Sequence, residues 1–283
     1  MTKIWDIEGS GVVSLSEVVA HLDAAGRSLF NEDLDYTASL LRGLCEDRSI
    51  LPDLLRRQLA GENIVDNRYS AQVFVLGRGE YFTLRAVIWD EPVGLQGEQM
   101  YLYELPHDHD FSFFTLGYFG PGYETVVRSY DNENVVGVEG ESVRTYDEER
   151  WTLSKGRVAL FEGGKDIHCQ LPPASLSISF NVLQNVASSG IRRRQYEFDE
   201  NFSSVRRVLN VNPVSLLARA ACAVGGAAVQ YVEEIAITAP GDYERAVALK
   251  ALVSLDPKYI SIAMDDRSPY VRAEALPKGM SGK

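Results

Sequence analysis

Cysteine and histidine are scarce in this chain of 283 residues, which has three cysteines and four histidines. Cys45, Cys169 and Cys222 are odd in number, lie far apart and have no Cys-x-x-Cys spacing. This usage does not suit a small domain held together by disulfides and favours a reducing compartment.

Long apolar runs and clustered positive charge are also lacking. The longest apolar stretch, around residues 218–229, is too short and too rich in glycine to span a bilayer. The first eleven residues do not have the pattern of a signal peptide. A formal net charge of −12 argues against wide contact with phosphate backbones, and the basic cluster at 192–194 is interpreted as a solvated strand end. We expect a cytoplasmic protein with no nucleic-acid partner and no membrane partner.

Residue patterns divide the chain into three zones. Residues 14–60 have helical periodicity and begin with a capping box formed by Ser14 and Glu17. Residues 64–200 form short runs rich in β-branched and aromatic residues, separated by Gly, Pro, Asp and Asn turns. This spacing is typical of a β-sandwich or a small β-barrel.

The last zone, residues 202–283, is helical again. Its Asp-x-Ser-Pro segment, with Pro269 in a first helical turn, resembles the second helix of a HEAT-type repeat. We therefore divide the chain into an N-terminal helical segment (1–62), a β-barrel (63–200) and an α-helical, HEAT-like extension (201–283).

One strand of the barrel zone has a clean alternation of apolar and polar residues. Over residues 175–182, every second side chain is polar. Because successive side chains on a strand point to opposite faces, the polar set predicts a stripe that lines a barrel interior. Its members are Ser175, Ser177, Ser179 and Asn181.

Two of the four histidines stand one residue apart, at His107 and His109. On a strand, positions i and i+2 share a face, so both imidazoles would point the same way. His168, which follows a strand and a Gly-Gly turn, is the candidate third ligand. Three imidazoles suit Fe(II), Zn(II), Cu(II) or Ni(II), with positions left open for other ligands. His21 lies in the first helix and is interpreted as a packing residue.

The segments HDHDFSFFTLGYFGPGYETVV, LFEGGKDIHCQL and ASLSISFNV together resemble the cupin superfamily, most closely its cysteine dioxygenase branch. The resemblance spans roughly residues 14–185. It implies a cupin barrel, that is, a double-stranded β-helix or jelly roll. It also implies a three-histidine iron site with His107, His109 and His168 as ligands. Glu124 would then be a turn or supporting residue and not a fourth ligand.

This chain departs from that branch in the polar shell around the metal. The branch places a Ser, a His and a Tyr on alternate positions of the strand after the third ligand, where this chain has Ser175, Ser177 and Ser179. The position of the cysteine that is cross-linked to that Tyr in animal members falls near Phe114. The resemblance therefore implies a retained scaffold with a wider, polar cavity and a substrate larger than free cysteine.

Candidate pocket residues follow from the resemblance and from strand spacing. The family binds a carboxylate through an Arg on an early strand, and Arg68, Arg78 and Arg85 are the candidates, with Arg68 and Arg85 preferred. Tyr101 and Tyr103 alternate on the run that leads to the histidine motif. The predicted pocket comprises Tyr101, Tyr103, Arg68, Arg85, Ser177 and Ser179. Further tyrosines considered for it are Tyr69, Tyr118 and Tyr123.

Three hypotheses of function follow. The first is a mononuclear non-heme Fe(II) oxygenase that uses O2 on a small-molecule or peptide-like substrate. It would not use 2-oxoglutarate, because Asp108 points away from the histidines beside it. The second is a redox-neutral metal cupin, an isomerase, lyase or hydrolase, with Zn, Mn or Ni in place of iron. The third is a non-enzymatic metal-binding sensor. A homodimer is expected by analogy with other cupins.

Overall fold

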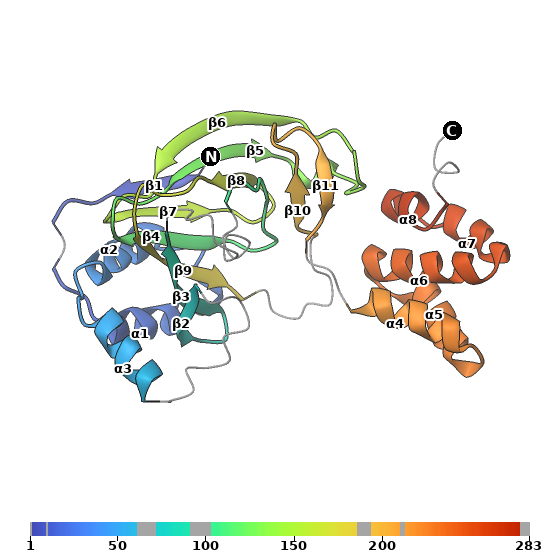
Figure 1. The fold of residues 1–283 in the computed structure, drawn as a ribbon, viewed down its shortest axis with the longest axis horizontal. Helices are drawn as coiled ribbons and strands as arrows, with labels where there is room; N and C mark the ends of the chain where they lie inside the picture. Colours follow the sequence, from blue (N-terminus) through green and yellow to red (C-terminus); the bar gives the residue numbers. More distant parts are fainter. Residues whose placement is uncertain are drawn as a thin grey trace. The chain divides into compact units, whose positions relative to one another are not determined.

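The structure is a computed structural model that describes residues 2–9, 11–60, 72–90, 103–185, 194–209 and 213–277. The chain forms two compact units (Figure 1). The first, here called the barrel unit, comprises Met1–Asp131 and Arg144–Ala187, and the second, the helical unit, comprises Asn132–Val143 and Ser188–Lys283. The finer boundaries at residues 62 and 200 stay predictions.

In its described parts, the barrel unit contains a six-stranded and a three-stranded antiparallel sheet. The larger sheet has the order β1-β7-β4-β9-β3-β2 and the smaller one β6-β5-β8. The strands are β1 (Lys3–Asp6), β2 (Val73–Arg78), β3 (Phe82–Trp89), β4 (Phe113–Phe119), β5 (Glu124–Tyr130), β6 (Thr145–Thr152), β7 (Arg157–Phe161), β8 (Asp166–Gln170) and β9 (Ser177–Gln184).

The path of the chain between these sheets defines the fold class. From β4 the chain crosses to β5 and β6, returns to β7, crosses again to β8 and ends on β9. Repeated crossing between two antiparallel sheets is the arrangement of a jelly roll and not of a meander. The jelly-roll barrel predicted from the sequence is therefore confirmed, with helices before and after it.

The strand register separates the two faces of the large sheet. Arg85 of β3 lies opposite Asn181 of β9, which lies opposite Thr115 of β4. This row, with Ser179 two residues along, faces the barrel interior, so the predicted polar stripe is confirmed from residue 177 onward. Ser175 precedes the strand and is exposed, so its predicted place in the stripe is wrong.

The opposite face of the large sheet packs on the N-terminal helices α1 (Leu15–Ala25), α2 (Leu34–Leu44) and α3 (Ile50–Leu59) (Figure 1). Phe114 belongs to this face and stacks on Phe30 at 5.8 Å, which takes it out of the barrel interior. The capping box predicted for Ser14 and Glu17 is present at the start of α1. His21 packs between helices through a 2.9 Å hydrogen bond to Thr37, as expected.

The helical unit contains a short hairpin followed by helices. Its elements are β10 (Tyr196–Phe198), β11 (Val205–Val208), α4 (Val214–Val224), α5 (Ala227–Thr238), α6 (Asp242–Leu255), α7 (Ile260–Met264) and α8 (Pro269–Glu274). Helices are present in the C-terminal zone, as predicted, but the helical pattern expected from residue 202 onward is wrong at 205–208, which form β11. Pro269 begins α8 as predicted. Among the described residues, no helix has the length and apolar character needed to cross a membrane.

Candidate metal centre

The β-ladder places His107 and His168 side by side. Their backbones exchange two hydrogen bonds, of 3.0 Å from the His107 N–H and 2.9 Å from the His168 N–H. His109 is held separately, because its carbonyl accepts a 2.8 Å hydrogen bond from the N–H of Gly164 in the β7–β8 turn. The expected regular strand through His107 and His109 is corrected to a single bridge at His107 followed by an irregular segment.

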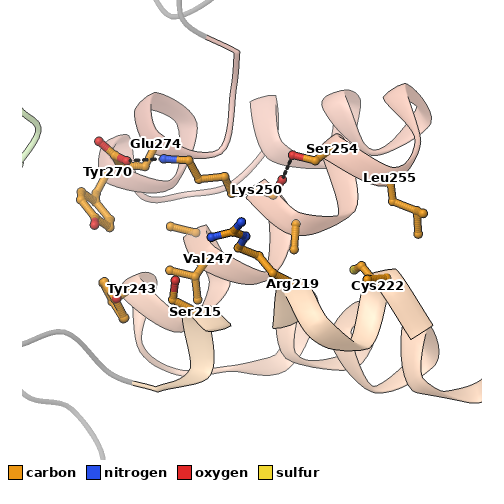
Figure 2. Close-up of a pocket in the computed structure, with 13 residues that line it drawn as sticks. Ser215, Arg219, Cys222, Tyr243, Val247, Lys250, Ser254, Leu255, Tyr270 and Glu274 are labelled. Atoms are coloured by element: carbon orange, nitrogen blue, oxygen red, sulfur yellow. Dashed lines mark hydrogen bonds and ion pairs between the residues drawn. The ribbon is translucent and has the colours of Figure 1, made fainter. Parts of the chain in front are cut away.

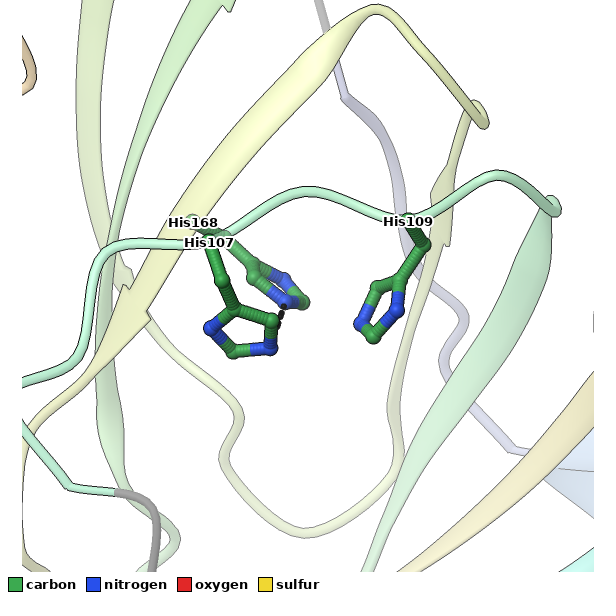
Figure 3. Close-up of side chains that lie close together, drawn as sticks. All are labelled: His107, His109 and His168. Carbon is green, nitrogen blue, oxygen red and sulfur yellow. Dashed lines mark hydrogen bonds between the residues drawn. The ribbon is translucent and has the colours of Figure 1, made fainter. Parts of the chain in front are cut away.

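The three imidazoles nevertheless converge on one point inside the barrel (Figure 3). Their ring centroids lie 4.5 to 5.1 Å apart, and one nitrogen of each ring lies within 4.8 Å of the others. Among the described residues, this is the one group of three or more His, Cys, Asp or Glu side chains with that spacing. The predicted association of the three histidines is therefore observed.

The charge state of the His109 and His168 rings suits a metal. Burial lowers the pKa of His109 well below its ordinary value, and the nearby His107 and Arg85 lower it further. Burial and the two other histidines do the same for the pKa of His168. Neutral imidazoles have a lone pair to offer, whereas imidazolium ions have none.

The ring nitrogens of His107 and His109 are bonded, or left unbonded, in a way that fits a metal ion where the three rings converge. Nδ1 of His107 lies 2.8 Å from the carbonyl oxygen of Leu105, which can only accept. The proton is thus assigned to Nδ1, and Nε2 is left with its lone pair 3.1 Å from Nε2 of His168. Nδ1 of His109 is buried without a hydrogen-bond partner. The donor set therefore fits a divalent ion with imidazole preference, such as Fe(II) or Zn(II).

The side chain between His107 and His109 in the sequence has a different role. Asp108 is fully buried, and its carboxylate accepts a 2.5 Å hydrogen bond from the Tyr130 hydroxyl on β5. This hydrogen bond anchors the backbone between His107 and His109 to β5. Asp108 points away from the ligand nitrogens, as the alternation predicted. Tyr130 was not predicted, because its link to Asp108 depends on how the sheets fold together.

A polar group lies deeper in the barrel. Trp89 donates a 2.9 Å hydrogen bond from Nε1 to the Ser179 hydroxyl, and Thr115 donates a 2.7 Å bond to Asn181. Burial raises the pKa of the Tyr123 phenol, while hydrogen bonds with Thr115 and Ser179 and the charge of Arg85 oppose the rise. Arg85 acts electrostatically on both His109 and Tyr123, which places the polar group beside the histidine cluster.

Aromatic side chains surround both groups. Phe111 stacks on His109 at 4.7 Å, and Phe161 lies edge-on to His168 at 4.7 Å. Trp151 packs against the apolar clusters on both sides of the interior, and its Nε1 is buried without a hydrogen-bond partner. The surroundings of the histidines therefore combine apolar rings, which exclude water, with a few hydrogen-bonding groups.

The turn before β5 positions Tyr123. Gly120 and Gly122 have φ angles of +83° and +84°, and a Cβ on Gly122 would lie 2.1 Å from the Leu153 carbonyl oxygen. Only glycine fits so close to that backbone, so the Gly-Pro-Gly turn folds Tyr123 inward. The same turn was visible in the sequence, and it is the signal from which a stronger prediction for Tyr123 could have come.

The other predicted pocket residues have mixed outcomes. Arg68, Tyr69 and Tyr101 lie outside the described residues. Tyr103 lies in a turn and not on a strand, which corrects the register expected for it. It still packs on Trp89 at 5.8 Å and donates a 2.7 Å hydrogen bond to the carbonyl of Asp90.

Three further candidates lie away from the histidines or are bound to backbone. Tyr118 faces the helices, stacked on Phe180 at 4.2 Å. The Ser177 hydroxyl accepts a 3.1 Å bond from the N–H of Gly122, so it braces the turn before Tyr123. Glu124 forms a 2.7 Å ion pair with Arg150 and is outside the ligand group, in line with the expected supporting role.

Cys169 is buried on the face of β8 opposite His168, and burial raises the pKa of its thiol to about 11. At pH 8 only about one Cys169 thiol in a thousand would be ionised, and burial also raises the pKa of Cys45 and Cys222. We predict that the native protein reacts negligibly with Ellman's reagent within minutes at pH 8, whereas the urea-unfolded chain releases three equivalents. A fast thiol in the native protein that Cys169→Ser removes would contradict the burial of this side chain.

No family model matches the sequence, and no curated protein matches it. Solved structures that match part of the chain include the DMSP lyase DddQ from Ruegeria pomeroyi, with 11% identity, a TM-score of 0.27 and coverage of 41% of this chain and 48% of that one. A cupin domain from Bordetella pertussis matches with 10% identity, a TM-score of 0.25 and coverage of 43% and 99%. Hydroquinone 1,2-dioxygenase from Sphingomonas sp. TTNP3, with 4-hydroxybenzoate bound, matches with 11% identity, a TM-score of 0.27 and coverage of 44% and 72%. This chain thus spans about half of the lyase.

Proposed function

We propose that the barrel unit is a mononuclear non-heme Fe(II) oxygenase that uses O2. The observation that carries this proposal is the set of three converging imidazoles, with no carboxylate among them in the described residues. Bound iron would supply open positions for substrate and O2 and a redox centre between them. His107, His109 and His168 would hold it. The alternative redox-neutral chemistry would use the same three ligands with another metal.

The electrons for O2 would come from the substrate itself. The usual ligand set of a 2-oxoglutarate enzyme is two histidines and one carboxylate, whereas Asp108, between the two histidines in the sequence, is bonded to Tyr130 and is not in the ligand group. Oxidation of a thiol, or cleavage of an aromatic ring or a C–C bond, meets this condition.

The polar group of the barrel interior would orient the substrate. The guanidinium of Arg85 suits an anionic group such as a carboxylate. The Tyr123 hydroxyl, held by Thr115 and Ser179, would donate a hydrogen bond to the reacting group, and its raised pKa keeps it protonated at neutral pH. Trp89 and Trp151 would exclude water from the apolar part of the substrate. A substrate larger than free cysteine is proposed because serine replaces the bulkier polar residues of the cysteine dioxygenase shell.

The test is metal analysis of the anaerobically purified protein, followed by O2-uptake measurements with thiols, thiol-containing peptides and catechols. About one equivalent of iron with substrate-dependent O2 uptake would support the proposal. Stoichiometric zinc, manganese or nickel, with turnover that needs no O2, would replace it with the redox-neutral alternative. Metal without turnover of any compound would favour the sensor.

Tyr123→Phe is expected to lower kcat/KM for O2 uptake by about ten- to a hundredfold, because it removes one buried hydrogen-bond donor and leaves the ring in place. Metal content should not change. Tyr118→Phe is the matched control, because that tyrosine faces the helices on the other side of the sheet. An equal fall in both variants would mean that Tyr123 acts through stability and not on the substrate.

A further inference from the structure

A groove of about 600 Å³ lies on the helical unit, between α4, α6 and α8 (Figure 2). Tyr243 and Tyr270 stand at one end of it and Leu255 at the other. Small residues of α4 and α6, such as Ala223 and Ala251, line it between these ends and leave the space open. The groove belongs to the helical unit and is separate from the histidine cluster.

One cation in the groove has no counter-ion. Arg219 of α4 makes no hydrogen bond or ion pair with any residue in the described part of the chain, and its guanidinium points into the groove. Two buried or half-buried arginines of this unit, Arg194 and Arg245, are paired. Arg194 bonds Asp242 at 2.9 Å, and Arg245 bonds Asp266 at 2.8 Å.

The other charges in the groove leave a net positive site. Lys250 pairs with Glu274 at 3.1 Å, so these two cancel and Arg219 remains. An unpaired guanidinium above an apolar floor suits a carboxylate next to an apolar group. A phosphate backbone is a poor fit, because its repeated charges would meet Glu274 as well as Arg219, whereas a single carboxylate needs to contact only Arg219.

The length of the groove suits a short peptide. Tyr243 and Ser254, both lining residues on α6, are separated by eleven helical steps, or roughly 16 Å. An extended chain covers that distance with about five residues. The hydroxyl of Ser215, also at the lining, can bond to a peptide backbone.

We propose that this groove binds an acidic peptide segment of another protein, with a carboxylate of the peptide on Arg219 and its apolar side chains over Ala223 and Ala251. The inference does not depend on the reaction in the barrel. It assigns the helical unit to partner recognition through complementary charge and a matched length.

The test is selection of displayed heptapeptides by the full-length protein. Two libraries are compared, one with Glu fixed at the centre and one with Lys, each with random flanks. The wild type is expected to enrich the Glu library over the Lys library by about tenfold, the effect of one charge-assisted hydrogen bond. Arg219→Glu should reverse the preference, whereas Arg206→Glu, an exposed arginine on β11 outside the groove, should not.

A second pair of variants separates the groove from the charge. Ala223→Trp would fill the groove and remove the selection, whereas Ala220→Trp, exposed on the same helix outside the lining, would keep it. Equal recovery of both libraries by the wild type, or an unchanged preference in Arg219→Glu, would overturn the proposal. Concentration-dependent self-association that Ala223→Trp abolishes and Ala220→Trp keeps would also overturn it, because a second copy would then occupy the groove.

Discussion

His168→Ala is expected to lose the bound metal of the barrel unit, with a fall in affinity of more than about a hundredfold. Replacement of a residue that only supports a metal ligand costs about ten- to a hundredfold, and His168 is one of three proposed ligands. Its ring is also buried between His107 and Phe161, so a group from the solvent-exposed surface cannot easily take its place as a metal ligand. Metal analysis of anaerobically purified protein measures the loss, and substrate-dependent O2 uptake should disappear with it.

The fourth histidine provides the control. His21→Ala removes an imidazole that bonds Thr37 between two helices, away from the cluster. This variant should keep its metal and its O2 uptake. Far-UV circular dichroism of both variants checks that the barrel still folds. Stoichiometric metal in a folded His168→Ala protein would contradict the three-histidine site, and with it the proposed chemistry.

The features that could be predicted from the sequence depend on local periodicity. The alternation after residue 176 predicted which side chains enter the barrel, because the pleat of a strand leaves no other choice once one face is apolar. Ser179 lies in the interior, and Phe180 lies on the helix side, as that pattern requires. The capping box of α1 is equally local, since Ser14 and Glu17 are three residues apart.

The features that could not be predicted depend on turns and on distant pairing. His107 and His109 converge although they share no regular strand, because the second is held by a backbone bond from Gly164. Tyr103 lies in a turn instead of the expected strand, and Glu104 in that turn has a φ of +55°. A positive φ is uncommon for a glutamate, so the sequence pattern does not predict it.

The interior polar group shows the same limit. Thr115 and Asn181 meet across 66 residues, and their bond depends on the register between β4 and β9. Each residue by itself has an ordinary strand environment. Their shared role appears only when the sheet is assembled, and a single sequence holds no record of that pairing.

Arg245→Met is expected to lower the free energy of unfolding of the helical unit by about 3–5 kcal/mol, because it leaves a buried aspartate without its cation. The Arg245 side chain is 4% exposed and Asp266 is 9% exposed, and two hydrogen bonds of 2.8 and 3.0 Å join them. Arg245 also donates to the carbonyls of Ala239 and Pro240. One side chain thus ties the start of α6 to the α5–α6 and α7–α8 connections.

The same pair sets a pH dependence. Burial raises the pKa of Asp266, but hydrogen bonds from Arg245 and Ser268 outweigh it, and the pKa lies below the ordinary value of 3.8. The folded state therefore favours the carboxylate, and its contribution to stability is present above about pH 4 and is lost as the pH falls. The difference between wild type and Arg245→Met should accordingly be largest near neutral pH and shrink in acid.

The positions of the tryptophans allow the two units to be followed separately. All three, Trp5, Trp89 and Trp151, belong to the barrel unit. Helices α4 to α8 of the helical unit contain more residues than α1 to α3 of the barrel unit, so the larger part of the helical ellipticity comes from the helical unit. In urea, Arg245→Met should shift an ellipticity transition to lower concentration and leave the midpoint of tryptophan fluorescence unchanged. Arg206→Met, an exposed arginine on β11 outside this pair, should shift neither. If fluorescence and ellipticity move together in Arg245→Met, the two units unfold as one, because loss of a contact confined to the helical unit would then be felt throughout the barrel.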